Sequence, residues 1–154
     1  MTSEQEKARP LQLHRSALQA HLEKDAGAFL AAYAPQWYDV RTAGIRLRTK
    51  EEALPAIDQY FRRTHFADIR EITAPIIHLS TDASMAWVIG EIRMHASQEV
   101  AHEEERDFSF RCAWVSIYEK HEGERAQVVD ASFFQFQTTD EESSSEGGRQ
   151  AVEP

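Results

Sequence analysis

One carboxylate stands inside an apolar stretch near the C-terminal end of the sequence. Asp130 lies between Val128-Val129 and Phe133-Phe134. Burial there would raise the pKa of an unpaired carboxyl group, which is the condition for a general acid or base. The alternative is an ion pair or a hydrogen bond with a neighbouring segment, which is the more common setting for such a carboxylate. Asp130 is therefore a candidate proton shuttle, and a structural role is the more common alternative.

Two further sets of side chains could line a binding site. Glu91 and Arg93 alternate with apolar residues such as Trp87. This spacing suits a pocket wall, but mutual charge pairing on an exposed strand face is the more common arrangement. Tyr33, Tyr38 and Trp87 would suit a flat apolar ligand, although aromatic residues at these spacings more often form plain core.

Other chemistries find no support in the spacing of the residues. The seven histidines show no His-Glu-x-x-His or His-x-His pattern, so no metal site is predicted. No Gly-x-Ser-x-Gly elbow is present, and Cys112 has no local signature of a reactive thiol. The six glycines form no phosphate-binding loop. We therefore expect a protein without a metal or a cofactor.

Length, charge and cysteine content narrow the class of protein. The 154 residues fit one domain that folds without disulfides. A formal net charge of −9 repels phosphate backbones, so nucleic acid is not an expected partner. Cys112 is the only cysteine, the first nine residues lack the apolar core of a signal peptide, and no long apolar run occurs. These features predict a cytoplasmic protein that does not enter a membrane.

Helical patterns fill the first part of the chain. Pro10 suits a first helical position, and His14 belongs to an apolar stripe at helical spacing. We expect a helix to begin there, after a flexible N-terminus of residues 1–9. Asp25 can cap a second short helix, and Thr49 with Glu52 matches the capping box of a third.

Strand patterns follow the helices. β-branched and aromatic residues predict long strands at 69–79, 85–96, 107–120 and 125–136, with a shorter strand at 37–42. Helices followed by an antiparallel sheet predict an α+β domain over residues 10–136, with the helices packed on one sheet face. Residues 137–154 are almost without apolar side chains and are expected to form a disordered acidic tail.

The last hairpin indicates a register and two sheet faces. A three-residue loop ending at Gly123 would close Lys120 against Glu124 and would place Trp114 opposite Asp130. One face then carries Phe110, Cys112, Trp114, Ser116, Val128, Asp130, Ser132 and Phe134. The other carries Arg111, Ala113, Val115, Ile117, Val129, Ala131 and Phe133. Because this second face is also largely apolar, something must cover it, and a partner subunit is the simplest cover.

Several short runs resemble one known family. They are Gly44-Ile45 before Thr49-Lys50-Glu51-Glu52-Ala53, then Ser84-Met85-Ala86-Trp87-Val88-Ile89-Gly90, then Cys112-Ala113-Trp114 with Tyr118-Glu119-Lys120. Over about residues 11–136 the chain is similar to the SnoaL-like branch of the NTF2-like superfamily. The resemblance implies a cone-shaped fold with an apolar pocket, often dimerised through the sheet. Relatives commonly carry Trp at the position of Arg125, and many carry His in the region of Asp130.

Three functions remain open at this point. The first is binding of a small apolar or aromatic molecule in a cone pocket lined by Tyr33, Trp87, Glu91, Phe110, Trp114 and Phe134. The second, implied by relatives that are isomerases, cyclases and dehydratases, is acid–base catalysis in which Asp130 moves a proton and Tyr38 or His14 orients a carbonyl. The third is protein interaction through the sheet face. A closed pocket with an unpaired buried carboxylate would favour the second function, and an apolar pocket without one would favour the first.

Overall fold

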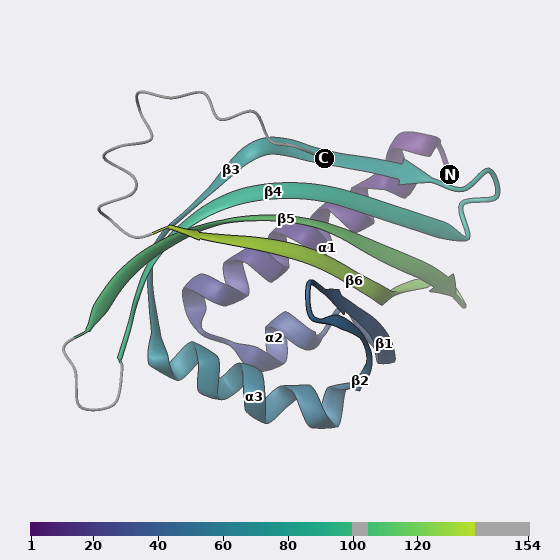
Figure 1. Ribbon diagram of the computed structural model, residues 1–154. Helices are drawn as coiled ribbons and strands as arrows, with labels where there is room; N and C mark the ends of the chain where they lie inside the picture. The colour runs from purple at the N-terminus through teal and green to yellow at the C-terminus, as the bar shows by residue number, and fades with distance from the viewer. Residues whose placement is uncertain (100–104, 138–154) are drawn as a thin grey trace.

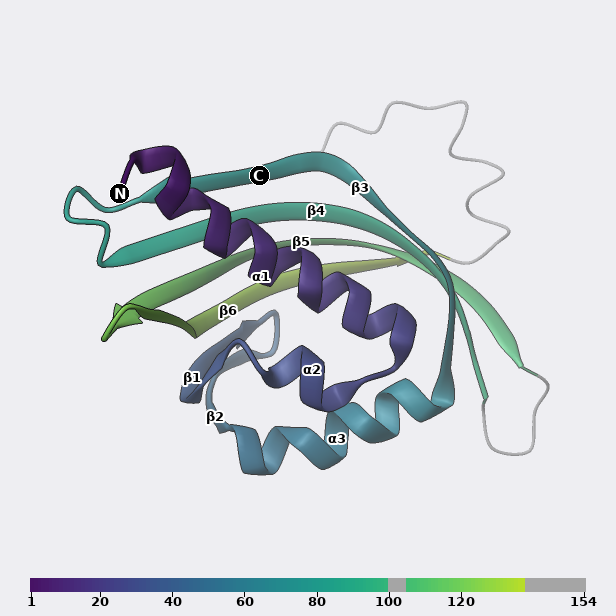
Figure 2. The ribbon, with the colours of Figure 1, turned by 180° about the vertical axis from the view of Figure 1, so that it is seen from behind.

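In the part of the chain that the structure describes, a curved sheet of six strands wraps around three helices, which lie on its concave side (Figure 1). The structure is a computed structural model that describes residues 1–99 and 105–137. The helices are α1 (Ser3–Glu23), α2 (Ala26–Leu30) and α3 (Lys50–Arg63). The strands are β1 (Tyr33–Arg41), β2 (Gly44–Thr49), β3 (Thr64–Leu79), β4 (Met85–Gln98), β5 (Arg106–His121) and β6 (Glu124–Gln137). The predicted α+β class, with helices on one sheet face, is confirmed (Figure 2).

The strand order is β2-β1-β6-β5-β4-β3, and every neighbouring pair except β1 and β6 is antiparallel. The sheet is therefore mixed, whereas the sequence predicted a purely antiparallel one. The difference arises because α3 carries the chain from β2 at one edge of the sheet to β3 at the other, so that β1 meets β6 in the same direction. This parallel pair sets Asp39 beside Asp130, which no local pattern in the sequence indicates.

Helix α1 begins seven residues earlier than the sequence predicted. Thr2 caps it, because its side chain accepts the N–H of Gln5 at 3.2 Å while the Gln5 side chain accepts the N–H of Thr2 at 2.8 Å. The first turns are also held on the sheet, since Glu6 pairs with Lys120 at 2.8 Å and Arg125 at 3.1 Å. Pro10 therefore lies inside the helix, and the prediction that it starts the helix is wrong.

The other two helices begin at the predicted N-cap residues. The Asp25 carboxylate accepts the N–H of Ala28 at 2.9 Å, and the Thr49 hydroxyl accepts the N–H of Glu52 at 3.2 Å. At the other end of the domain, Gln137 belongs to β6. The remainder of the predicted tail lies outside the described residues.

The β5–β6 hairpin turns more tightly than predicted. His121 pairs with Glu124, so the loop is Glu122-Gly123 alone, with φ of 51° and 83°. Two residues with positive φ match the twist of a two-residue hairpin. A bulge between Ile117 and Tyr118 then shifts the register further. As a result Ser116, and not Trp114, lies opposite Asp130. Beyond the bulge the pairing of β5 with β6 differs from the predicted register by two residues in total. Because side chains alternate with a period of two, each residue there still lies on the sheet face that was predicted for it.

A glycine on the inner side of β4 makes room for the largest side chain of the site. Gly90 pairs with Trp114, and a Cβ at position 90 would lie 2.5 Å from the indole ring. The indole therefore lies flat over the strand. Deeper in the cone, Phe61 is 1% exposed and packs with Phe29 and Phe66, which joins α3 to α2 and to β3.

Candidate functional site

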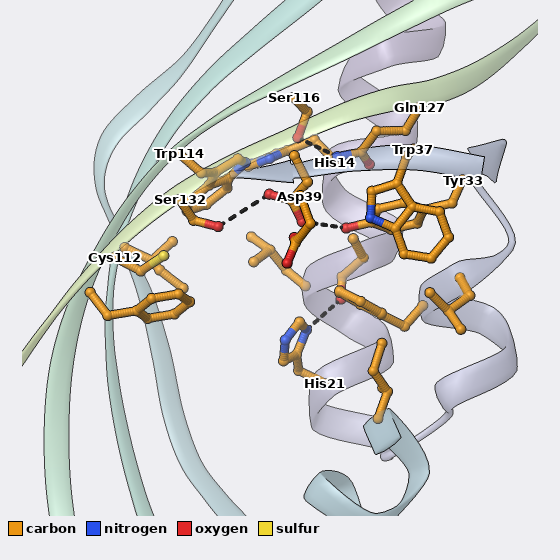
Figure 3. A pocket seen from close by; sticks show the side chains of 18 of the residues that line it. His14, His21, Tyr33, Trp37, Asp39, Cys112, Trp114, Ser116, Gln127 and Ser132 are labelled. Carbon is orange, nitrogen blue, oxygen red and sulfur yellow. Dashed lines mark hydrogen bonds between the residues drawn. The ribbon is translucent and has the colours of Figure 1, made fainter. Parts of the chain in front are cut away.

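A cavity of about 250 Å³ lies inside the cone. Its lining comes from all three helices and from every strand except β3. Most of the lining side chains are apolar or aromatic, among them Leu18, Phe29 and Phe110. Trp37 and Trp114 belong to the same lining (Figure 3). The cavity therefore has the composition of a ligand pocket, with a small number of polar groups that could fix an orientation.

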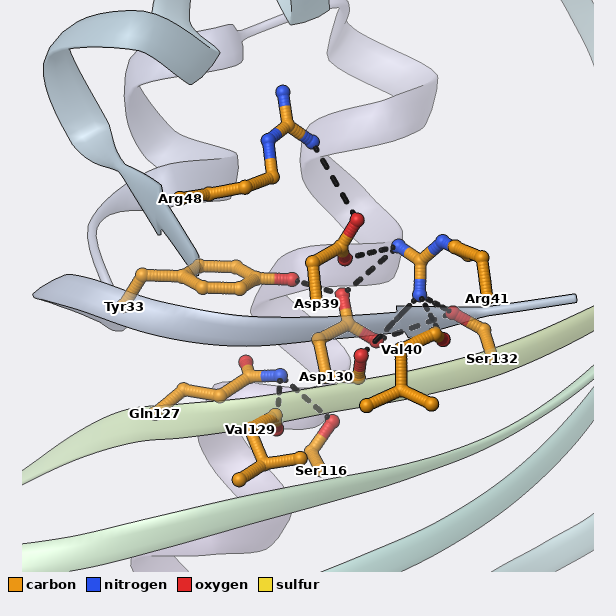
Figure 4. A network of polar contacts seen from close by, with 10 residues as sticks. All are labelled: Tyr33, Asp39, Val40, Arg41, Arg48, Ser116, Gln127, Val129, Asp130 and Ser132. Atoms are coloured by element: carbon orange, nitrogen blue, oxygen red, sulfur yellow. Dashed lines mark hydrogen bonds and ion pairs between the residues drawn. The ribbon is translucent and has the colours of Figure 1, made fainter. Parts of the chain in front are cut away.

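The main polar group of the cavity wall is centred on Asp130 (Figure 4). The Tyr33 hydroxyl donates to Asp130 Oδ2 at 2.7 Å, and the Ser132 hydroxyl donates to Oδ1 at 3.1 Å. Arg41 adds longer contacts of 3.4 Å to both carboxylate oxygens and a short hydrogen bond to the Ser132 hydroxyl. The Asp130 carboxylate is buried but paired on both oxygens. This is the structural arrangement that the sequence left open.

Burial and the nearby carboxylates set the protonation states of Tyr33 and Arg41, which contact Asp130. Burial raises the pKa of Tyr33 well above its ordinary value, and Asp130 acts in the same direction, so the phenol stays protonated and donates. Burial alone would lower the pKa of Arg41, but the carboxylates of Asp130 and Asp39 raise it. Arg41 therefore stays charged.

A second carboxylate, Asp39, lies next to this group and was missed by the sequence reasoning. It is 7% exposed, and its Oδ1 lies 2.9 Å from Arg41 Nη2 in an ion pair without hydrogen-bond geometry. Arg48 is more distant, with Nη1 at 4.0 Å from Oδ2. Burial raises the pKa of Asp39, as does Asp130, while Arg41 and Arg48 oppose the shift.

Strand alternation could have revealed Asp39. Trp37, Asp39 and Arg41 alternate along β1 and all line the cavity. Tyr38, on the opposite face of this strand, was predicted as a site residue instead. Asp39 was therefore missed.

Two histidines of α1 also line the cavity. His14 is 4% exposed, stacks on Trp114 with ring centroids 5.3 Å apart, and places Nε2 3.3 Å from Glu71 Oε1. Burial lowers the pKa of His14, although Glu71 opposes the shift. His21 lies two turns further along, where burial likewise lowers its pKa. His21 was not predicted as a site residue, because it stands at the margin of the helical stripe in the sequence.

The structure brings most of the predicted site residues together. The cavity lining includes Asp130, His14, Tyr33, Phe110, Trp114 and Phe134. Their functional roles stay predictions.

Three predicted residues lie outside the lining. Tyr38 is 54% exposed and faces away from the cavity, because its neighbours Trp37 and Asp39 face inward on β1. Trp87 and Glu91 lie on the outer face of β4, where Trp87 stacks on His78 at 5.6 Å and Glu91 accepts a hydrogen bond from Thr73 at 3.0 Å. The expectation that Tyr38, Trp87 and Glu91 form part of the pocket is therefore wrong.

Two kinds of feature are absent from the described residues. Across residues 1–99 and 105–137, no three His, Cys, Asp or Glu side chains stand close enough together to hold a metal ion. In the same part of the chain, no helix has the length and apolar character needed to cross a membrane.

Comparison with known proteins gives relatives in structure only. No family model matches the chain, and no curated protein matches it. Kfla4162 protein from Kribbella flavida is similar with a TM-score of 0.71 at 10% identity, covering 88% of this chain and 95% of its own. A ketosteroid isomerase-like protein from Erwinia carotovora atroseptica has a TM-score of 0.62 at 16% identity, covering 84% and 95%. An NTF2-like protein from Cytophaga hutchinsonii has a TM-score of 0.60 at 13% identity, covering 86% and 98%. At these identities the likeness is one of fold.

Proposed function

We propose that this chain, which has an NTF2-like fold, binds one small and mostly apolar molecule inside its cone. The observation that carries the proposal is the cavity of about 250 Å³ with apolar walls and one polar wall. Ligand pockets commonly occupy roughly 300–1,000 Å³, so this cavity would take a compact molecule of one or two rings.

The pairing of Asp130 supports binding over catalysis by that residue. Its two oxygens accept hydrogen bonds from Tyr33 and Ser132, and Arg41 contacts both. A carboxylate committed in this way is poorly placed to take a proton from a ligand. Instead it orients two hydroxyl groups and a guanidinium along one wall, where they can fix the polar end of a ligand.

Acid–base catalysis is the second candidate, and Asp39 is the residue that favours it. Its buried Oδ1 has no hydrogen bond from any described residue, and burial raises the pKa of the carboxyl group; both are features of a proton-transfer group. The sequence resemblance includes isomerases and dehydratases, and one structural neighbour is described as ketosteroid isomerase-like. Exchange of the α-protons of 2-tetralone in D₂O would test this. Catalysed exchange that Asp39→Asn abolishes supports an enzyme, and no catalysed exchange excludes this chemistry for that ketone.

A homodimer through the outer sheet face is also part of the proposal. Ile76, Ile89 and Phe133 are 42%, 37% and 57% exposed on that face. A second copy of the chain would cover them with the same residues, as in an isologous interface. The same face could instead bind a different protein, which remains the third open function.

The cellular location of the protein and its branch of the NTF2-like superfamily also belong to the proposal. The single cysteine, Cys112, is free and buried, which supports the cytoplasm as the place of action. Membership of the SnoaL-like branch rests on the short sequence runs alone.

Calorimetric titration with 2-naphthol tests the binding function. This two-ring molecule is small enough for the cavity, so we expect saturable binding to the wild type at one site. Ala17 lines the cavity, and Ala17→Phe should fill it and weaken binding at least ten-fold. Ala56→Phe, on the exposed side of α3, is the matched control and should leave affinity unchanged. Equal affinities for all three proteins would place the ligand outside the cavity and contradict the proposal.

A further inference from the structure

His21 lines the cavity (Figure 3), and three phenylalanine rings surround its imidazole. Its ring centroid lies 4.8 Å from Phe29, 5.2 Å from Phe61 and 5.7 Å from Phe66. These rings come from α2, α3 and β3 and carry no charge. Asp130 on β6 is the charged group that acts on the imidazole across the cavity.

One nitrogen of this ring has its proton fixed. Nδ1 lies 2.8 Å from the backbone oxygen of Ala17. A carbonyl oxygen can only accept, so Nδ1 carries the proton and donates. In the neutral ring, Nε2 then holds a lone pair and no proton. Burial lowers the pKa of His21, which keeps the ring in this neutral form.

The remaining nitrogen, Nε2, is an acceptor without a donor. Among the described residues no hydrogen bond to Nε2 is present, whereas His14 has its Nε2 engaged by Glu71. On the far wall, the Tyr33 and Ser132 hydroxyls are already donated to Asp130. This acceptor is free to bind a ligand in the cavity, and a ligand that donates to it gains affinity over one that cannot.

We propose, on the basis of the proposed binding function, that the ligand carries an O–H or N–H group that donates to Nε2 of His21. The ligand class is therefore hydroxylated or amino-bearing ring molecules, and not plain hydrocarbons or ethers of the same shape. His21 acts here as the residue that selects for the donor group.

A pair of probes that differ only in the donor tests this selection. The probes are 2-naphthol and 2-methoxynaphthalene, titrated into the wild type, His21→Phe and His21→Gln. The wild type should prefer 2-naphthol about ten-fold. His21→Phe, which keeps a ring but has no acceptor, should bind both probes equally. His21→Gln can place an oxygen near the position of Nε2 and should restore part of the preference. His78→Phe, on the outer face, is the control and should keep the full preference.

Each outcome separates the two proposals. If the wild type binds both probes with equal affinity, the selection by His21 is overturned while the binding function stands. If His21→Phe folds and keeps the ten-fold preference, the donor is met by another residue and the inference is again overturned. If the wild type binds neither probe, the binding function fails and the inference falls with it. Should His21→Phe not fold, the wild-type preference and its reduction in His21→Gln decide the matter.

Discussion

Replacing Asp130 by Asn should lower stability, because the structure commits both carboxylate oxygens. The Asn side chain has one acceptor and one donor, so it cannot accept from Tyr33 at Oδ2 and from Ser132 at Oδ1 together. Whichever way the amide turns, a hydroxyl loses its acceptor and an N–H group faces another donor. The buried Tyr33 phenol is the costlier hydroxyl to leave unpaired.

The size of the effect follows from these contacts. Losing a hydrogen bond to a charged group costs about 1.5–3 kcal/mol. In Asp130→Asn, Arg41 would keep its ion pair with Asp39 at 2.9 Å, and its side chain is 31% exposed. The larger cost of leaving a buried charge without a partner therefore does not apply. We therefore expect a loss of about 2–3 kcal/mol in the free energy of unfolding. For a domain of this size that corresponds to a melting temperature lower by roughly 5–10 °C.

Urea unfolding of the wild type and Asp130→Asn at neutral pH measures this difference. Asp58→Asn is the matched control, because Asp58 forms an exposed pair with Arg62 within one helix, a type of contact worth about 0.5 kcal/mol or less. Unchanged or raised stability in Asp130→Asn would refute the reasoning. It would mean that the carboxylate is strained in the fold, as expected of a catalytic group, and it would return Asp130 to the role of proton shuttle.

Three further predictions concern the sheet and the histidines. Val115→Glu on the outer face should convert a dimer into a monomer in light scattering, since it would bury an unpaired charge at the interface; a wild type that is already monomeric at micromolar concentration would contradict the dimer. Gly90→Ala should cost about 1–3 kcal/mol in urea unfolding, because the added Cβ meets the Trp114 ring at 2.5 Å; an unchanged midpoint would show that the indole can move at little cost. Burial lowers the pKa of His14 and His21 in the folded state, so the unfolded chain binds more protons than the folded one. The free energy of unfolding should therefore be highest above pH about 6.5 and should fall as the pH drops through the folded pKa values. His21→Phe should reduce that slope in melts from pH 7.5 to 5, and a slope equal to that of the wild type would mean that His21 does not contribute.

The sequence predicted those parts of the fold that depend on local pattern. Thr49 with Glu52 and Asp25 mark their helix starts because a cap involves residues only a few positions apart. The four long strands were predicted for the same reason. The start of α1 was missed although Thr2 and Gln5 form a local capping box. The first turns carry no apolar stripe, and they are anchored by Glu6 with Lys120 and Arg125, a contact between distant segments.

The candidate site was predicted only in part, for a related reason. Strand alternation placed Phe110, Trp114 and Asp130 on the inner face correctly, since a two-residue error in register keeps the face. The inner face of β1 was not recognised, so Tyr38 was chosen and Asp39 was missed. The adjacency of β1 and β6, which brings Asp39 to Asp130, depends on topology and leaves no local trace.

A crystal structure of the protein with 2-naphthol tests the central claim most directly. We predict that the two rings occupy the cavity between α1 and the sheet, in contact with Trp114 and Phe29, with the hydroxyl oxygen within hydrogen-bond distance of His21 Nε2. Rings inside the cavity with the hydroxyl turned to Asp39 or Asp130 would keep the binding function and remove the role of His21. Crystals grown at saturating 2-naphthol that show an empty cavity, or the ligand on the outer sheet face, would contradict the account.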